Sequence, residues 1–383
     1  MSPDTSEKPC YEVKLYDPEA GTQAFLVIDT LTGGFAAGGI RLSPTVTLEE
    51  VQELARTMTR KFRLLKIPLG GAKAGIVADP ASPQKEAHLR AFARLAEPFL
   101  KELYIAGEDL GTTARDVALV YREAGCSWFD VVSQRGAERF REAGIPLDAL
   151  KGLRPTDLEG VNLEEVLTGF GIAEVTEEAC LPLGFEPGEC RVSMQGFGTV
   201  GGAAARYLAE KGFRLVAVAD ARGVLYHENG LPVEELLAAR DELGLIDRGK
   251  LSFPLEERPR EEWLRVEADV LIPAAISGAV HEGNVQEIHP NVRLVVEAAN
   301  LPLTPGAERA LFERGVVVIP DFLANAGAAG GFGMLLTAQV PPDPMRVLAE
   351  LKERLRAVTR EVLAESKQRG CPPREAAEAL ARP

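Results

Sequence analysis

The stretch 191–220 decides the fold of this chain, and it reads RVSMQGFGTVGGAAARYLAEKGFRLVAVAD. Its apolar pattern predicts a strand, a glycine-rich turn, a helix of small residues that ends at Gly212, and a second strand. The turn has the spacing G-x-G-x-x-G and consists of Gly196, Phe197, Gly198, Thr199, Val200 and Gly201. Its glycines would let a pyrophosphate approach the unpaired N–H groups of the helix, so we expect a dinucleotide-binding unit.

The second predicted strand ends at Asp220, at the spacing expected of an acid that binds ribose hydroxyls. A carboxylate at this position favours NAD, because it repels the 2′-phosphate of NADP. Arg222, two residues later, leaves NADP open as a second cofactor. The competing interpretation of the motif is structural, with small residues that only allow a helix to pack closely on a strand. We therefore expect NAD, with NADP as the alternative.

Further strands are predicted downstream of this unit, within 268–275, 293–300 and 315–327, with helical patterns between them. Strands that alternate with helices are typical of a parallel, doubly wound sheet. Upstream, the apolar run AFLVI at 24–28 suggests a short sheet, so the fold class predicted for the whole chain is α/β.

Amphipathic helices are predicted at 47–65, 85–104 and 343–368. The first of them has the spacing of a capping box at its start, with Thr47 and Glu50.

A chain of 383 residues is long enough for two domains with separate cores. We expect an N-terminal α/β substrate and oligomerisation domain at 1–150 and a Rossmann-type dinucleotide-binding domain at 166–325. A C-terminal helical segment at 326–383 is expected to pack back on the first domain. The stretch 130–165 shows no clean period, so it is interpreted as a boundary or an insertion.

The bulk composition argues against several classes of partner. A formal net charge of −14 disfavours nucleic acid and anionic membrane surfaces. No apolar run approaches the roughly 20 residues that span a bilayer, and no secretion signal is visible, so we expect a cytoplasmic protein without a membrane partner. The five cysteines and four histidines have no spacing typical of a disulfide framework or a metal site, so no metal is expected.

A single lysine, Lys73, lies among small residues in IPLGGAKAGIVADP at 67–80. The apolar lead-in and the strand-like run that follows indicate a buried or half-buried place. Burial disfavours an ammonium ion, which can turn a lysine into a usable base. The simpler interpretation is a tight turn whose lysine points to water. If Lys73 is functional, its small neighbours would leave room for a substrate and keep the amine poorly hydrated.

Two other charged positions lie close to it in the sequence. Lys61 falls on the apolar stripe of the helix predicted at 47–65, three residues after Met58. A charge on that stripe needs a partner or a ligand carboxylate, unless its stem runs along the core and its head reaches water. Further on, Asp109 precedes a glycine turn in YIAGEDLGTT at 104–113.

Together these motifs resemble the glutamate/leucine/phenylalanine/valine dehydrogenase family, over roughly 30–125 and 165–335. The motifs that carry the resemblance, in the family's order, are GGIR, MTRK, PLGGAKAG, AGEDLGTT, QGFGTVG, VVEAAN and ANAG. The resemblance implies a two-domain enzyme that oxidatively deaminates an L-amino acid to a 2-oxo acid and ammonium. It also implies a homo-oligomer such as a hexamer, or a hetero-oligomer with a paralogue.

The resemblance also assigns roles to single positions. Lys73 matches the family's catalytic lysine, Asp109 its catalytic aspartate, and Lys61 the lysine that holds the substrate α-carboxylate. A cation at Lys61 would help Lys73 to lose its proton, and neutral Lys73 could then deprotonate the water that attacks the iminium. Asp109 would move protons to and from the amine. Further substrate positions are Gly38, Gly39 and Met58, and further cofactor positions are Thr168, Ala274, Asn300 and Asn325.

The substrate class is read from two positions of the family pattern. Glutamate-specific members carry a lysine immediately before the two glycines of GGIR, where this chain has Ala37. The second position follows ANAG, where glutamate enzymes offer a hydroxyl and this chain has Ala329 and Phe332. Burying a carboxylate without a cation is costly, so an apolar substrate such as leucine or valine is expected. Glutamate is the alternative, because the sequence from 190 onward is more like the glutamate branch.

The chain departs from the family pattern in EGVNLEEVLTGFG at 159–171, where an ATG-type motif is usual and only Thr168-Gly169 remains. This departure leaves open a second class of function, a non-catalytic relative that binds amino acid or nucleotide and regulates a partner subunit. A reductase of hydroxy acids is a third interpretation. It would need a histidine or tyrosine acid, and none of the four histidines lies in a motif.

Overall fold

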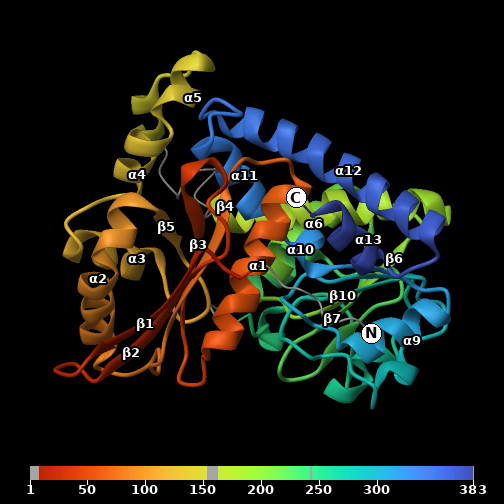
Figure 1. Ribbon diagram of the computed structural model, residues 1–383. Coiled ribbons are helices and arrows are strands. Elements are labelled where there is room, and N and C mark those ends of the chain that lie inside the picture. The colour runs from red at the N-terminus through yellow and green to blue at the C-terminus, as the bar shows by residue number, and fades with distance from the viewer. Residues whose placement is uncertain (1–7, 153–162, 242–243, 383) are drawn as a thin grey trace. The chain divides into compact units, whose positions relative to one another are not determined.

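The computed structural model describes residues 8–152, 163–241 and 244–382 (Figure 1). By its internal contacts the chain divides into two compact units. The first holds the described residues up to 152 together with Phe332–Val347, and the second holds those from 163 to 331 together with Leu348–Arg382. Each unit has its own sheet, so the chain is an α/β protein as predicted.

The first unit is built on a five-stranded sheet in the order β1-β2-β4-β3-β5. Its strands are β1 (Tyr11–Asp17), β2 (Thr22–Ile28), β3 (Ala36–Leu42), β4 (Gly70–Ile76) and β5 (Tyr104–Gly107). β1, β2 and β4 pair antiparallel, whereas β4, β3 and β5 pair parallel. The carboxyl ends of these three parallel strands therefore meet at one edge of the sheet.

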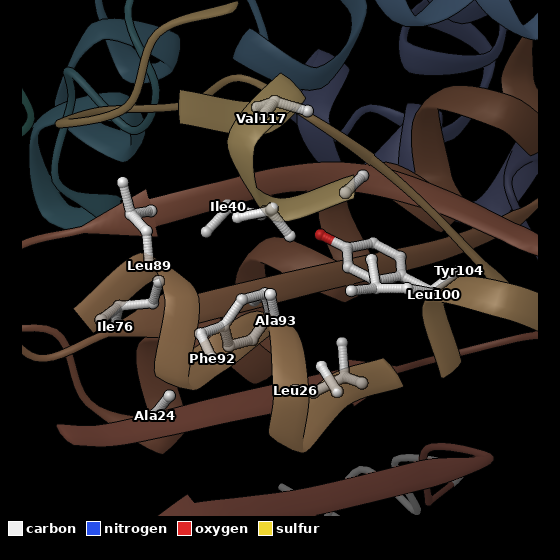
Figure 2. Close-up of a cluster of buried hydrophobic side chains, with 14 of the residues drawn as sticks. Ala24, Leu26, Ile40, Ile76, Leu89, Phe92, Ala93, Leu100, Tyr104 and Val117 are labelled. Atoms are coloured by element: carbon white, nitrogen blue, oxygen red, sulfur yellow. The ribbon is translucent and has the colours of Figure 1, made fainter. Parts of the chain in front are cut away.

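Two long helices cover this sheet, α1 (Leu48–Leu64) and α2 (Lys85–Glu102), close to the ranges predicted. Figure 2 shows α2 side chains such as Phe92 packed on Leu26 and Ile76 of the sheet, within a core cluster of this unit. α1 packs on the opposite face, against Phe25 and Val27 of β2. The side chain of Thr47 accepts from the Glu50 N–H at 3.2 Å and caps α1, as the sequence predicted.

Short elements complete the described part of the first unit. They are the 3-10 turns η1 (Thr32–Gly34) and η2 (Leu147–Gly152) and the helices α3 (Ala114–Glu123), α4 (Trp128–Arg135) and α5 (Ala137–Glu142). The stretch 130–165, interpreted as irregular, thus contains helices that are too short to show a clean period. Its part 153–162 lies outside the described residues.

The second unit is built on a seven-stranded sheet in the order β12-β11-β10-β6-β7-β8-β9. Its strands are β6 (Arg191–Gln195), β7 (Arg214–Ala219), β8 (Val224–Tyr226), β9 (Glu256–Arg258), β10 (Val270–Pro273), β11 (Leu294–Val296) and β12 (Val317–Ile319). The five strands from β12 to β7 run parallel, and β8 and β9 form an antiparallel edge. This Rossmann-type sheet confirms the predicted fold, and the strand order reverses at β6, where such sheets bind ligands.

The helices and 3-10 turns of this unit connect and cover the strands. They are α6 (Leu163–Cys180), η3 (Leu181–Leu183), α7 (Thr199–Glu210), α8 (Val233–Ala239), η4 (Arg248–Lys250), η5 (Arg260–Leu264), η6 (Val285–Glu287), α9 (Pro305–Glu313) and α10 (Asp321–Ala324). α11 (Gly327–Leu336) begins in this unit and ends in the first. α12 (Pro344–Arg369) and α13 (Pro373–Leu380) end the chain. The predicted strand, helix and strand of 191–220 are β6, α7 and β7.

The C-terminal segment differs in part from the prediction that 326–383 packs back on the first domain. Only Phe332–Val347 belong to the first unit, and Leu348–Arg382 belong to the second. α12 lies beside α6 (Figure 1), where Arg356 pairs with Glu174 at 2.5 Å. Apolar contacts join the two helices as well, since Leu355 Cδ1 lies 3.2 Å from the place of a Cβ on Gly171. The amphipathic pattern predicts a buried stripe on α12 but does not reveal which element covers it.

Candidate active site

Lys73 lies in the middle of β4, and only 6% of it is exposed. It is therefore not a turn lysine that points to water. Side chains alternate along a strand, so Lys73 shares its face with Gly71 and Gly75. A Cβ at Gly71 would come within 2.3 Å of Thr59 N, and one at Gly75 within 2.6 Å of Val51 Cγ2, both on α1. These glycines make room for the helix rather than for a substrate, which corrects the expectation from sequence.

The partner of Lys73 is Asp109, which follows β5. Lys73 Nζ lies 2.9 Å from Asp109 Oδ1, and both side chains are largely buried. β3 lies between the strands that carry them. They meet across β3 because Gly39 has no side chain: a Cβ there would come within 2.8 Å of Asp109 Cβ. The structure thus brings together the two residues that the sequence predicts to be catalytic.

Arg41 of β3 is a candidate that the sequence analysis missed. Its Nε donates to Asp109 Oδ2 at 2.7 Å, and its Nη1 donates to Glu50 Oε1 at 2.6 Å. Burial raises the pKa of Asp109, but Lys73 and Arg41 outweigh it and hold that pKa below its ordinary value. Asp109 is therefore an ionised carboxylate between two cations. The available signal was the arginine of GGIRLSP, a charge flanked by isoleucine and leucine.

The backbone of Asp109 is tied to β3 through Thr112. Asp109 N donates to Thr112 Oγ1 at 3.0 Å, and this hydroxyl donates to Ile40 O of β3 at 2.7 Å. Gly111 has a φ of 82°, and a Cβ there would come within 2.0 Å of Leu42 O. A non-glycine residue is disfavoured at such a φ. The place of Asp109 is therefore set by β3 as much as by β5.

The other predicted substrate residues of the first unit lie on α1 and β3. Lys61 is buried on α1, and Met58 is half-buried on the same helix. Met58 Cγ lies 3.5 Å from the place of a Cβ on Gly38, so α1 and β3 approach closely there. Ala37 is buried on β3, in register with Gly71 of β4 and Ile105 of β5.

The two predicted specificity residues on α11 fall into different units. Ala329 is half-buried and belongs to the second unit, whereas Phe332 is half-buried and belongs to the first. Their roles at the substrate stay predictions.

The glycine-rich turn has the geometry that a pyrophosphate needs. Gly196 has a φ of 94°, and a Cβ at Gly201 would come within 2.2 Å of Gly196 O, so both glycines are required. Gly198 is the N-cap of α7, and a Cβ there would meet no described atom within 4 Å. Thr199 is exposed and Val200 half-buried, at the start of the helix. These residues fit a dinucleotide, since backbone N–H groups at a helix start favour an anion.

The structure places a cation beside this turn that was not predicted. Arg240, which follows α8, donates from Nη1 to Gly198 O at 2.7 Å. Its guanidinium lies within 2.1 Å of the place of a Cβ on Gly202, so this glycine too is required by packing. Phe197 is fully buried behind the turn. The sequence around Arg240 contains no motif that could have indicated this position.

Asp220 directly follows β7, one residue beyond the end of the strand, and its carboxylate already has many partners. Oδ1 accepts from the N–H groups of Arg222 and Gly223 at 2.8 and 3.2 Å, and Oδ2 accepts from Ile246 N at 3.0 Å. The guanidinium of Arg248 donates to both oxygens. Burial raises the pKa of Asp220, but Arg248 and these N–H groups outweigh it and lower that pKa.

The remaining predicted cofactor residues lie after β10, after β11, at the end of α10 or on α6. Ala274 follows β10, and its N–H donates to Gln195 O of β6 at 2.7 Å. Asn325 Nδ2 donates to Asn300 Oδ1 at 3.0 Å, so these two asparagines lie together. Thr168 is buried on α6, where a Cβ on Gly327 would come within 3.0 Å of its Cα.

Two further findings concern the described residues as a whole. None of their helices is long and apolar enough to cross a membrane. Within the same part of the chain, no three His, Cys, Asp or Glu side chains are grouped so that they could hold a metal ion.

Comparisons with known proteins agree with this architecture. The model of the glutamate/leucine/phenylalanine/valine dehydrogenase family matches residues 160–382, and the model of the dimerisation domain of Glu/Leu/Phe/Val dehydrogenases matches residues 12–125. The chain belongs to this family. It is an oxidoreductase of the NAD(P)-dependent amino-acid dehydrogenase class, which acts on CH–NH2 donors.

Individual relatives of this family are similar over most of the chain. A glutamate dehydrogenase of Thermotoga maritima is 36% identical over 77% of this chain and 67% of its own. An NADP(+)-dependent glutamate dehydrogenase of Pyrobaculum calidifontis is 36% identical over 76% of this chain and 66% of its own. The matches thus span about two thirds of these relatives.

Among solved structures, the hetero-hexameric glutamate dehydrogenase of Thermus thermophilus in its leucine-bound form superposes with a TM-score of 0.77. It is 30% identical, and the match covers 97% of this chain and 87% of that one. Since relatives include NAD-specific and NADP-specific enzymes, a nicotinamide dinucleotide is the cofactor of this family member.

Proposed function

We propose that this family member catalyses the reversible, NAD(P)-dependent oxidative deamination of an apolar L-amino acid to the 2-oxo acid and ammonium. The observation that carries the proposal is the buried pair of Lys73 and Asp109, with 2.9 Å between Nζ and Oδ1. A buried ion pair contributes little net stability because both charges must be desolvated, so a buried lysine paired with a carboxylate that follows the carboxyl end of a parallel strand favours a catalytic role.

The pair is suited to holding one proton at either of two atoms. The ammonium of Lys73 stabilises the ionised form of Asp109 at a distance of 2.9 Å. When Lys73 gives up its proton, Asp109 keeps only Arg41 to lower its pKa and becomes a better proton acceptor. This property fits a reaction that removes a proton first from the substrate ammonium and later from the attacking water.

The other proposed roles are those of the family positions that these residues match. Lys61, buried on α1, would hold the substrate α-carboxylate. The turn from Gly196 to Gly201 would hold the pyrophosphate, and the Asn300–Asn325 pair would lie at the nicotinamide end. A bound nicotinamide would accept the hydride from the substrate Cα. Neutral Lys73 would then deprotonate the water that attacks the iminium carbon, and Asp109 would return a proton to the departing amine.

The preference for an apolar amino acid rests on Ala37. It is buried, and its register partners Gly71 and Ile105 are uncharged as well. A side-chain carboxylate in this place would lack a cation from these three positions, and an unpaired buried carboxylate is costly. Leucine or valine would bury apolar surface instead, next to half-buried Met58.

Exchanging this position tests the substrate assignment. The variant Ala37→Lys should raise kcat/KM for glutamate relative to leucine by about tenfold or more, because one charge-assisted hydrogen bond is gained. The ratio is measured for both amino acids with wild type and variant under the same conditions. A ratio that does not change would refute the role of Ala37.

Glutamate is the second candidate substrate, because the relatives at 36% identity are glutamate dehydrogenases. A panel of amino acids, each with NAD and with NADP, separates the candidates by the absorbance of the reduced nicotinamide. Turnover of leucine or valine above glutamate supports the proposal, and the reverse order favours glutamate. No turnover with retained nucleotide binding would favour a regulatory subunit.

We further propose that the chain works as an oligomer. The similar Thermus thermophilus protein is a hetero-hexamer, which makes a homo-hexamer or an assembly with a paralogue the expected states. Light scattering of the purified chain measures the molar mass directly, and a monomer at micromolar concentration would contradict this expectation.

A further inference from the structure

The end of β7 carries an arrangement that a ribose-reading acid would not need. In dinucleotide-binding folds, an acid at this place binds the ribose hydroxyls and excludes the 2′-phosphate. A carboxylate offers about four lone-pair sites. Asp220 accepts five hydrogen bonds from Arg222, Gly223, Ile246 and Arg248, and its side chain is only 3% exposed. It has no acceptor capacity left for a ribose diol.

The charge of Asp220 is also compensated. The guanidinium of Arg248 faces the carboxylate with both terminal nitrogens, the bidentate geometry of the strongest ion pairs. The repulsion that this carboxylate would exert on a phosphate is therefore largely cancelled at close range.

Arg222 adds a positive charge at the same place. Its N–H is bound to Asp220 Oδ1 at 2.8 Å, so its backbone is held in the turn after β7. Its side chain is exposed, and no ion pair joins it to another described residue. The carboxylate of Glu257, 3.6 Å from Arg248 Nε, would repel a phosphate at this place. Because 62% of the Glu257 side chain is exposed, water screens this repulsion.

We propose that this chain binds the 2′-phosphate of the adenosine ribose. Arg222 would contact the phosphate, and Arg248 would be the positioning residue that occupies and neutralises the carboxylate of Asp220. The cofactor preference would then be for NADP, or equal for both dinucleotides, instead of the NAD preference that an acid at this position suggests. The inference rests on the proposed function only in requiring that a nicotinamide dinucleotide binds at this turn.

The test uses two fragments that differ by one phosphate, 2′,5′-ADP and 5′-ADP, titrated calorimetrically into the full chain in a phosphate-free buffer of fixed ionic strength. We expect wild type to bind 2′,5′-ADP at least as tightly as 5′-ADP. Arg222→Gln should weaken 2′,5′-ADP by about tenfold and 5′-ADP by less than about twofold, because only the first loses a charge-assisted contact.

Arg248→Gln should act on both fragments, weakening 2′,5′-ADP and strengthening 5′-ADP, because it frees Asp220 for the ribose. Arg206→Gln is the matched control, since Arg206 lies on α7 of the same unit in an exposed pair with Glu234 and should change neither affinity. Because Arg222 is exposed, its variant should keep the wild-type melting temperature, which is measured alongside.

Tighter binding of 5′-ADP by wild type, or an affinity ratio unchanged in Arg222→Gln, would overturn the inference. Binding of neither fragment would overturn it as well. The first two outcomes are independent of the proposed function, because no amino acid is present and no hydride is transferred. Binding of neither fragment would also count against the proposed function, which needs a dinucleotide at this turn. A chain that binds both fragments as expected and turns over no amino acid would refute only the proposed function.

Discussion

Among single residues, Asp109 is the one whose state depends most directly on its neighbours. Burial opposes its ionisation, and the ammonium of Lys73 together with the guanidinium of Arg41 reverses that effect. Both neighbours are themselves largely buried, with 7% and 12% of their side chains exposed. A change in either cation therefore acts on the protonation of Asp109 without strong screening by water.

The variant Arg41→Gln tests this dependence. Its loss should raise the pKa of Asp109, so the acidic limb of the kcat/KM profile should move to higher pH. Since a carboxylate with a lowered pKa adds stability above its unfolded pKa and loses it as pH falls, the variant should also be less stable at neutral pH, by about 1.5–3 kcal/mol.

Arg60→Gln is the control for Arg41→Gln. Arg60 lies on α1 in the same unit and pairs with Glu53 at 2.7 Å, far less buried than Arg41. Its variant should keep the wild-type pH profile. A profile of Arg41→Gln that coincides with wild type would show that Arg41 does not set the protonation of Asp109.

At the scale of elements, β3 is the strand that organises the site, and glycine at position 39 is what lets β4 and the end of β5 meet across it. A Cβ at Gly39 would come within 2.3 Å of Glu108 O and 2.8 Å of Asp109 Cβ. Gly39→Ala should therefore displace Asp109, lower stability by about 1–3 kcal/mol and reduce kcat strongly.

Gly107→Ala is the matched control. Gly107 of β5 is the register partner of Gly39 of β3, but a Cβ on Gly107 would meet no described atom within 4 Å. It should keep both stability and turnover close to wild type. Equal effects of the two variants, measured by thermal unfolding and by nicotinamide absorbance, would refute the role given to Gly39.

A second arrangement at this scale joins α13 to the sheet of the second unit. Arg374 of α13 forms ion pairs with Glu297, Glu308 and Asp321, and Asp321 Oδ2 accepts from the N–H of Leu301 beside Asn300. Burial raises the pKa of Glu297 to about 8, with Arg374 opposing it. Three carboxylates thus share one guanidinium.

The raised pKa of Glu297 predicts a pH effect on stability. Between the ordinary pKa of about 4.5 and about 8, the folded state holds a proton that the unfolded state lacks, so stability falls as pH rises, by up to about 1.4 kcal/mol per pH unit. Glu297→Gln removes this titration and should flatten the decline in melting temperature from pH 6 to pH 8. Parallel declines in wild type and variant would contradict the prediction.

Predictability from sequence also differs between elements. α1, α2 and α12 lie close to their predicted ranges, because an amphipathic period and a capping residue are local signals. The contact between Lys73 and Asp109 is not local, since it depends on the strand order β4-β3-β5. The motif order of the family suggested both residues. It did not reveal the role of Arg41, nor that α1 fills the space beside Gly71 and Gly75.

At the scale of the whole molecule, each unit carries one part of the proposed chemistry. The first unit holds the pair of Lys73 and Asp109 that is proposed to transfer protons, and the second holds the glycine-rich turn that is proposed to bind the pyrophosphate. The two-sheet α/β fold could be predicted from the alternation of strands and helices. The assignment of Leu348–Arg382 to the second unit could not, because it depends on contacts between residues far apart in the sequence, such as the ion pairs of Arg356 with Glu174 and of Arg374 with Glu297.

Because the two units carry different parts of the proposed chemistry, one measurement tests the central claim. It is the turnover of the preferred amino acid by Lys73→Ala, followed by the absorbance of the reduced nicotinamide. We predict a loss of about 10²–10⁴-fold in kcat, typical of removing a general base, with unchanged affinity for the ADP fragments. Lys85→Ala, which removes a lysine paired with Asp116 in the same unit, should keep wild-type turnover. Turnover of Lys73→Ala at the wild-type rate would contradict the account.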